Sequence, residues 1–180
     1  MNYLRQQRHK HVKYDEHLME NHPDLEPKMR SILLDWLMEV CDCFHLQKST
    51  FYLAISYIDS YLSDTGTNTA NKTLVAKSQL QLLGITALFV AAKIEEIEPP
   101  KLLKFAYITD GACSTDEIVL QEISLLQTLK WRAHPVTVYD WLRLYLQTTY
   151  SYLVQSTTKT KSLSKLEVNY EYIGQEFIKF

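Results

Sequence analysis

Residues 80–92 of the chain read LQLLGITALFVAA, and this stretch decides the fold class. Apolar side chains fall on most sides of a helix drawn through it, which is typical of a helix buried at the centre of a helical domain. Gly84 and the alanines at 87, 91 and 92 are small enough for other helices to cross closely. We expect this helix from about residue 74 to residue 96, because Pro99-Pro100 cannot continue it.

Amphipathic segments flank the central helix on both sides. Their apolar residues recur at helical spacing, and Pro27 and the Ser114–Glu117 capping box mark two helix starts. The expected helices lie at 29–44, 51–62, 102–108, 114–129 and 137–146. Small polar residues predict loops at 63–71 and 151–165, before a last amphipathic piece at 166–180. The predicted fold is all-α, with five helices around a central one and a fragmentary addition.

The composition excludes several classes of protein. The chain has 180 residues, 46% hydrophobic and 22% charged, with a formal net charge of −2, which fits a packed core and not a basic nucleic-acid arm. Four glycines and five prolines are too few for a turn-rich β-sandwich. No apolar run reaches the roughly 20 residues of a membrane helix, and the first residues lack a secretory signal. Three cysteines form no disulfide framework, which favours a reducing, intracellular compartment.

No pattern of catalytic or metal-binding residues stands out. The chain has no glycine-rich phosphate loop and no nucleophile elbow, so we expect no catalytic residue, no metal and no cofactor. Glu95, Glu96 and Glu98 diverge around a helix and predict a solvated or capping run, not a pair of catalytic acids. Cys41 and Cys43 point to nearly opposite sides of a helix and predict no zinc site. Four histidines lie in a polar N-terminal stretch that we expect to be exposed: His9, His11, His17 and His22.

Three charges interrupt the apolar pattern. Glu122 interrupts the stripe of Ile118, Leu125 and Leu129, and Lys93 lies beside apolar residues on the central helix. An unpaired buried charge is costly, so each needs a partner or a route to water. The residues alone leave two interpretations open: the two charges pair with each other, or they form a polar clamp for the exposed backbone of a partner. For the third, Arg30, we expect a structural salt bridge to Asp59.

The helix at 29–44 carries a wider apolar arc than one core contact needs. One of its faces holds Met29, Ile32, Leu33, Trp36 and Val40, and the neighbouring face holds Leu34, Leu37, Met38, Cys41 and Phe44. The second face already supplies a core stripe. The first is therefore either core or an exposed groove that holds short apolar peptides, and the residues alone leave both interpretations open.

Four motifs occur in the order found in one protein family. Residues 29–40, MRSILLDWLMEV, resemble the opening of a cyclin box, and residues 93–100, KIEEIEPP, resemble its second hallmark. Residues 107–113, YITDGAC, and residues 129–132, LKWR, look most like E-type cyclins. The chain thus resembles the cyclin family, most of all an E-type (G1/S) cyclin, over roughly residues 15–147.

The resemblance implies a cyclin-box fold and a regulatory subunit that is not itself an enzyme. Such a subunit binds a cyclin-dependent Ser/Thr kinase, holds the PSTAIRE helix of that kinase in its active placement and docks RxL-motif substrates and inhibitors. The family's five signature positions map onto Arg30, Asp59, Leu82, Lys93 and Glu122. The implied kinase-binding residues are Lys93, Glu122, Val90, Ile94, Ile97 and Leu126. The implied substrate-docking patch is Met29, Ile32, Leu33, Trp36, Glu39, Leu80 and Gln81.

The same resemblance divides the chain into an N-terminal arm (1–27), an N-terminal cyclin box (28–134) and the start of a truncated second box (135–180). The chain departs from the family at Glu98, where tyrosine is usual, and at Ser60, where arginine is common. The family implies a nuclear protein, found also in the cytoplasm and at the centrosome, without nucleic-acid or membrane partners. The alternative is a cyclin-fold scaffold of the transcription-factor type, which contacts DNA or other proteins without activating a kinase.

Overall fold

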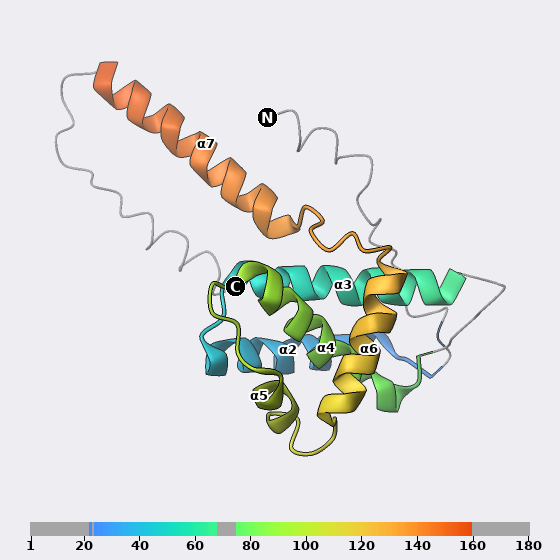
Figure 1. Ribbon diagram of the computed structural model, residues 1–180. Helices are drawn as coiled ribbons and strands as arrows, with labels where there is room; N and C mark the ends of the chain where they lie inside the picture. Colours follow the sequence, from blue (N-terminus) through green and yellow to red (C-terminus); the bar gives the residue numbers. More distant parts are fainter. Residues whose placement is uncertain (1–21, 23, 68–74, 160–180) are drawn as a thin grey trace. The chain divides into compact units, whose positions relative to one another are not determined.

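The computed structural model describes residues 22, 24–67 and 75–159, and these residues form helices and no strand. The helices are α2 (Pro27–Phe44), α3 (Lys48–Thr67), α4 (Lys77–Glu95), α5 (Leu102–Tyr107), α6 (Thr115–Thr128) and α7 (Val138–Lys159) (Figure 1). The predicted all-α fold class is confirmed. None of these helices is long and apolar enough to span a bilayer.

The chain divides into two compact units, residues 1–141 and residues 142–180. The first unit holds α2 to α6, and α4 contacts each of the other four helices. Every residue of α4 from Leu83 to Ala92 is buried. A helix that is apolar on most sides has to be covered on most sides, and α4 is the central helix that the sequence predicts.

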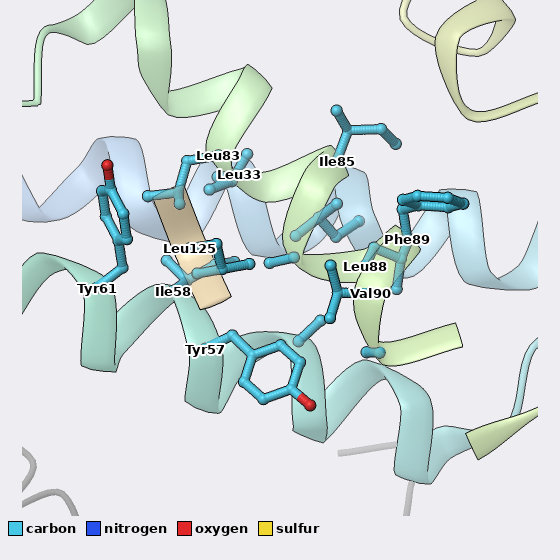
Figure 2. Packing of buried hydrophobic residues seen from close by; sticks show 14 of the residues in the cluster. Leu33, Tyr57, Ile58, Tyr61, Leu83, Ile85, Leu88, Phe89, Val90 and Leu125 are labelled. Atoms are coloured by element: carbon cyan, nitrogen blue, oxygen red, sulfur yellow. The ribbon is translucent and has the colours of Figure 1, made fainter. Parts of the chain in front are cut away.

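The core of the first unit draws side chains from five helices, α2 to α6. Figure 2 shows them gathered in one cluster, with Leu33 of α2, Ile58 of α3, Leu88 of α4 and Leu125 of α6 among its buried members. Gly84 lets α2 approach α4 closely, since a Cβ atom at this position would stand 2.7 Å from Leu33 Cδ1. The small residues of α4 therefore allow the crossing that the sequence predicts.

Local sequence signals set two of the helix starts. Pro27 lies in the first turn of α2, where a missing N–H costs nothing. At the start of α6, the hydroxyl of Ser114 accepts a hydrogen bond from the N–H of Glu117 at 3.2 Å. In return, the N–H of Ser114 donates to Glu117 Oε2 at 2.8 Å. The predicted capping box is confirmed.

Both segments expected to be loops are partly helical, so those predictions are wrong in part. α3 continues to Thr67, into the segment 63–71, and α7 continues to Lys159, into the segment 151–165. Small polar side chains lower helix propensity only modestly, and extending an existing helix is much easier than starting one. The polar composition therefore does not mark where either helix ends. The rest of both segments, and the expected piece at 166–180, lie outside the described residues.

The expected exposure of the N-terminal arm is wrong at His22, whose side chain is fully buried. The N–H of Val75 donates to His22 Nδ1 at 3.3 Å, so the proton of the neutral ring is on Nε2. His22 Nε2 then donates to the carbonyl oxygen of Leu62 at 3.0 Å. The ring thus ties the chain before α2 to α3 and to the residues that lead into α4. The other three histidines of the arm lie outside the described residues.

Candidate functional site

Lys93 of α4 and Glu122 of α6 form an ion pair through Nζ and Oε1. Their side chains are 39% and 16% exposed, so the pair lies at the surface and not in the core. Lys93 Nζ also stands 4.4 Å from the centroid of the Phe89 ring, within reach of a cation–π interaction. An ammonium group has three N–H donors and a carboxylate has several lone pairs. Both groups therefore keep bonding capacity for a partner while they are paired.

Accessible apolar side chains lie within four residues of this ion pair along α4 and α6. Ile97, just after α4, is 95% exposed, Ile94 is also exposed, and Leu126 of α6 is half-buried. We refer to Lys93, Ile94, Ile97, Glu122 and Leu126 as the α4–α6 face. Val90 is different, because it is only 2% exposed and belongs to the core beneath the face. Exposed apolar side chains around a charged pair are typical of a surface that binds another protein.

The same side of α6 carries two further exposed residues that the sequence analysis did not single out. Val119 and Ile123 are both exposed. At 100° per residue they share one side of the helix with Leu126. A signal for them was present in the sequence, since both are apolar and lie off the buried stripe of Ile118 and Leu125.

The residues assigned to substrate docking separate into buried and accessible ones. Leu33 and Leu80 are buried in the core. The accessible ones on α2 are Ile32, which is 58% exposed, Glu39, which is exposed, and the half-buried Met29 and Trp36. These four lie on one side of the helix, and we refer to them as the α2 stripe. Gln81 of α4 is half-buried. The core side of α2 combines residues from both predicted faces, namely Leu33, Leu37, Val40 and Cys41.

Arg30 of α2 and Asp59 of α3 lie in ion-pair contact, with Arg30 Nε 2.8 Å from Asp59 Oδ1. Ser60, next to Asp59, donates its hydroxyl proton to the carbonyl oxygen of Ser56 at 2.7 Å. Leu82, another of the five signature positions, is half-buried on α4. The signature positions thus occupy three different kinds of place: a helix–helix ion pair, the edge of the core and the α4–α6 face.

The acidic run at the end of α4 bonds to neighbouring segments. Glu96 accepts a hydrogen bond from the N–H of Gln47 at 2.8 Å. Glu95 Oε1 lies 3.4 Å from His134 Nε2. Glu98 is exposed. The three carboxylates therefore do not converge on one point, and two of them join segments that are distant in the sequence.

Cysteine and metal chemistry give no further candidate in the part of the chain that the structure describes. No three His, Cys, Asp or Glu side chains gather there as ligands for a metal ion. Cys41 and Cys113 are buried, and Cys43 is exposed. Burial raises the pKa of the Cys41 thiol to about 12, so at neutral pH this thiol is protonated and unreactive.

Comparison with known proteins finds a matching sequence family and relatives that agree with it. The sequence model described as cyclin, N-terminal domain, matches residues 1–134. G1/S-specific cyclin-E1 of Rattus norvegicus is 50% identical over 136 residues, which are 76% of this chain and 31% of the rat protein. G1/S-specific cyclin-E of Drosophila melanogaster is 53% identical over 130 residues, 72% of this chain and 17% of that protein. The chain thus spans about a third or less of the length of these relatives.

A solved structure resembles the fold. The X-ray structure of a viral cyclin from herpesvirus saimiri superposes with a TM-score of 0.65 at 27% sequence identity. The match covers 80% of this chain and 60% of the viral one. The arrangement of helices around α4 is therefore shared with a protein whose sequence has diverged widely.

Proposed function

The chain belongs to the cyclin family, and we propose that it is the part of a G1/S cyclin that binds and activates a cyclin-dependent protein kinase. In this role it acts in the nucleus as a regulatory subunit, and the catalytic groups belong to the kinase. Its relatives of G1/S-specific cyclin-E type support the proposal, because they share half of their residues with this chain over the matched region.

The α4–α6 face is the proposed contact with the kinase. The observation that carries this proposal is a charged pair at the surface, Lys93 and Glu122, with accessible apolar residues close by in the sequence, among them the almost fully exposed Ile97. Such a face can give hydrogen bonds to free backbone groups at the end of a partner helix and bury apolar area around them. We propose that it holds the PSTAIRE helix of the kinase, so that the Lys–Glu ion pair of the active kinase forms.

Exchanging the two charges distinguishes two hypotheses: that Lys93 and Glu122 bind the kinase, or that they serve only as an ion pair within the subunit. Lys93→Ala or Glu122→Ala should weaken kinase binding by about 2–4 kcal/mol, because each leaves a group without its partner in the interface. The double variant Lys93→Glu/Glu122→Lys keeps an internal pair and reverses the bonding groups offered to the kinase. We expect its binding to remain weak. Recovery of affinity in this double variant would show that the pair serves only the fold of the subunit.

The measurement is a calorimetric titration of the chain into a monomeric, inactive cyclin-dependent kinase, followed by a kinase assay on the mixture. Leu120→Ala is the matched control, because Leu120 is exposed on α6 and lies about 160° around the helix from Glu122. It should bind as the wild type does. A folded, helical wild-type chain that does not bind any such kinase would favour the scaffold alternative.

The α2 stripe is the proposed docking site for RxL-motif substrates and inhibitors. Half-buried Met29 and Trp36 beside the exposed Ile32 offer apolar contacts, and the carboxylate of Glu39 can attract the arginine of the motif. Trp36→Ala should leave kinase binding unchanged and lower turnover only of peptides that carry the motif. Ser31→Ala on the same helix is the control, because Ser31 is exposed and lies about 140° around the helix from Trp36. An equal loss on a short peptide without the motif would mean that Trp36 serves the core instead.

A further inference from the structure

The carboxylate of Glu96 joins two helix ends that lie far apart in the sequence. Glu96 is the first residue after α4, where the backbone turns to an extended conformation. Its Oε1 accepts hydrogen bonds from the N–H of Gln47, at 2.8 Å, and from the hydroxyl of Thr50. The Gln47 side chain returns the contact, since its Nε2 lies 3.4 Å from the carbonyl oxygen of Glu95.

These contacts supply a cap that α3 lacks in its own sequence. The first N–H groups of a helix have no partner inside the helix, and in a capping box a glutamate of the first turn accepts from the residue that precedes it. In α3 that place is held by Thr50, whose side chain is fully buried and carries no charge. Glu96 takes over the role from another helix. One of its oxygens satisfies both the N–H of Gln47 and the buried hydroxyl of Thr50.

The position of Glu96 matters because it lies within the run of residues that forms the α4 side of the α4–α6 face. Lys93, Ile94 and Ile97 all lie within three residues of Glu96 in the sequence. Ile97 is almost fully exposed, so its own side chain does little to fix its position. The backbone around Glu96 has to hold it in place. Ordering a loose segment at the moment of binding reduces affinity, and a segment that is already ordered avoids this cost.

We propose that Glu96 is a positioning residue of the α4–α6 face: through Gln47 and Thr50 it fixes the end of α4, and so presents Ile97 and Lys93 in a form ready for the kinase. This inference rests on the proposed binding of a kinase by that face. Glu96 would then contribute to kinase binding without touching the kinase.

Three variants test the proposal by affinity. Glu96→Ala removes the tie, Glu96→Gln keeps its shape and one acceptor, and Thr50→Val removes a bonding partner without changing the face. We expect Glu96→Ala to weaken kinase binding by about tenfold, with smaller losses for the other two. Glu117→Gln is the matched control, because it weakens the cap of α6 without touching the end of α4. It should lower thermal stability and leave kinase affinity unchanged.

A double-mutant cycle shows whether Glu96 acts through Ile97. If it does, Ile97→Ala should cost less affinity in the Glu96→Ala background than in the wild type, since Ile97 is already misplaced there. Unchanged affinity in Glu96→Ala and Thr50→Val, beside a loss of stability like that of Glu117→Gln, would overturn the inference and leave the proposed function intact. A wild-type chain that binds no kinase would instead overturn the proposed function, and this inference with it.

Discussion

The guanidinium of Arg30 and the carboxylate of Asp59 meet through two parallel hydrogen bonds, Nε to Oδ1 and Nη2 to Oδ2, both 2.8 Å long. This geometry matches the fork of an arginine to both oxygens of one carboxylate. The side chains are only 20% and 15% exposed, so the pair is screened less than a surface pair. It joins the start of α2 to the middle of α3.

Removal of one partner should therefore destabilise the first unit. We expect Arg30→Ala to lower the free energy of unfolding by about 2 kcal/mol, between the small value of exposed pairs and the larger value of buried ones. Arg30→Lys should recover only part of this, because lysine cannot make two parallel bonds. Urea unfolding of Arg30→Ala, Asp59→Ala and the variant with both changes measures the coupling energy between the two side chains. If the two single changes in the free energy of unfolding simply add up in the double variant, the ion pair does not stabilise the fold.

The three cysteines should differ sharply in reactivity. The thiolate is the reactive form, and burial raises the pKa of both Cys41 and Cys113. Cys43 is exposed on α2. A short treatment of the native chain with iodoacetamide should modify Cys43 alone, while the unfolded chain should react at all three positions. Mass spectrometry of the intact chain and of Cys43→Ser gives the answer. Rapid native labelling of Cys41 would mean that α2 opens easily.

Helices with a strong apolar period could be predicted from the sequence, and segments without one could not. α4 is recognisable because almost every position from Leu83 to Ala92 is apolar or small, and burial on all sides is the only stable place for such a helix. The last turns of α3 and α7 consist mostly of small polar residues, with no apolar period in them. The backbone hydrogen bonds that keep these turns helical leave no mark on the pattern of side chains.

The candidate site shows a similar division. Lys93 and Glu122 could be singled out because each interrupts an apolar pattern, which one helix reveals by itself. Their pairing, the burial of Val90 and the bond from Gln47 to Glu96 depend on how different helices pack. His22 also stood in a polar stretch, and nothing in the local sequence revealed that Leu62 and Val75 would enclose it. Partners that are distant in the sequence require the fold.

Thr86 should tolerate, and even favour, an apolar replacement. Its side chain is fully buried in α4, and its hydroxyl has no hydrogen-bond partner within the described part of the chain. An unmet buried hydroxyl costs about 1–3 kcal/mol, and valine has nearly the same shape. Thr86→Val should raise the free energy of unfolding by about 1 kcal/mol in urea titrations. Thr86→Ser keeps the hydroxyl, loses a methyl group and should be less stable. A clear loss of stability in Thr86→Val would reveal a hydrogen bond to a water molecule.

The cap of α6 should make stability depend on pH in the acid range. Hydrogen bonds from the N–H and the hydroxyl of Ser114, at 2.8 and 2.7 Å, hold the pKa of Glu117 below its ordinary value of 4.5. A group whose pKa is lower in the folded state stabilises the fold fully above its ordinary pKa. That contribution is lost as the pH falls through the lower, folded value.

The test compares the wild type with Glu117→Gln and Ser114→Ala in urea unfolding from about pH 6 to about pH 3. Ser114→Ala should cost about 1 kcal/mol at neutral pH, as is usual for the loss of a helix cap. The difference in free energy of unfolding between the wild type and Glu117→Gln should stay constant in the upper part of this range and shrink in the lower part. The reason is that protonated Glu117 no longer accepts both hydrogen bonds as a charged group. Asp116→Asn is the control, since Asp116 is exposed in the same turn and has no part in the capping box. A difference between wild type and Glu117→Gln that does not change with pH would mean that the carboxylate acts only through its shape. In that case the charge of Glu117 contributes nothing to the start of α6.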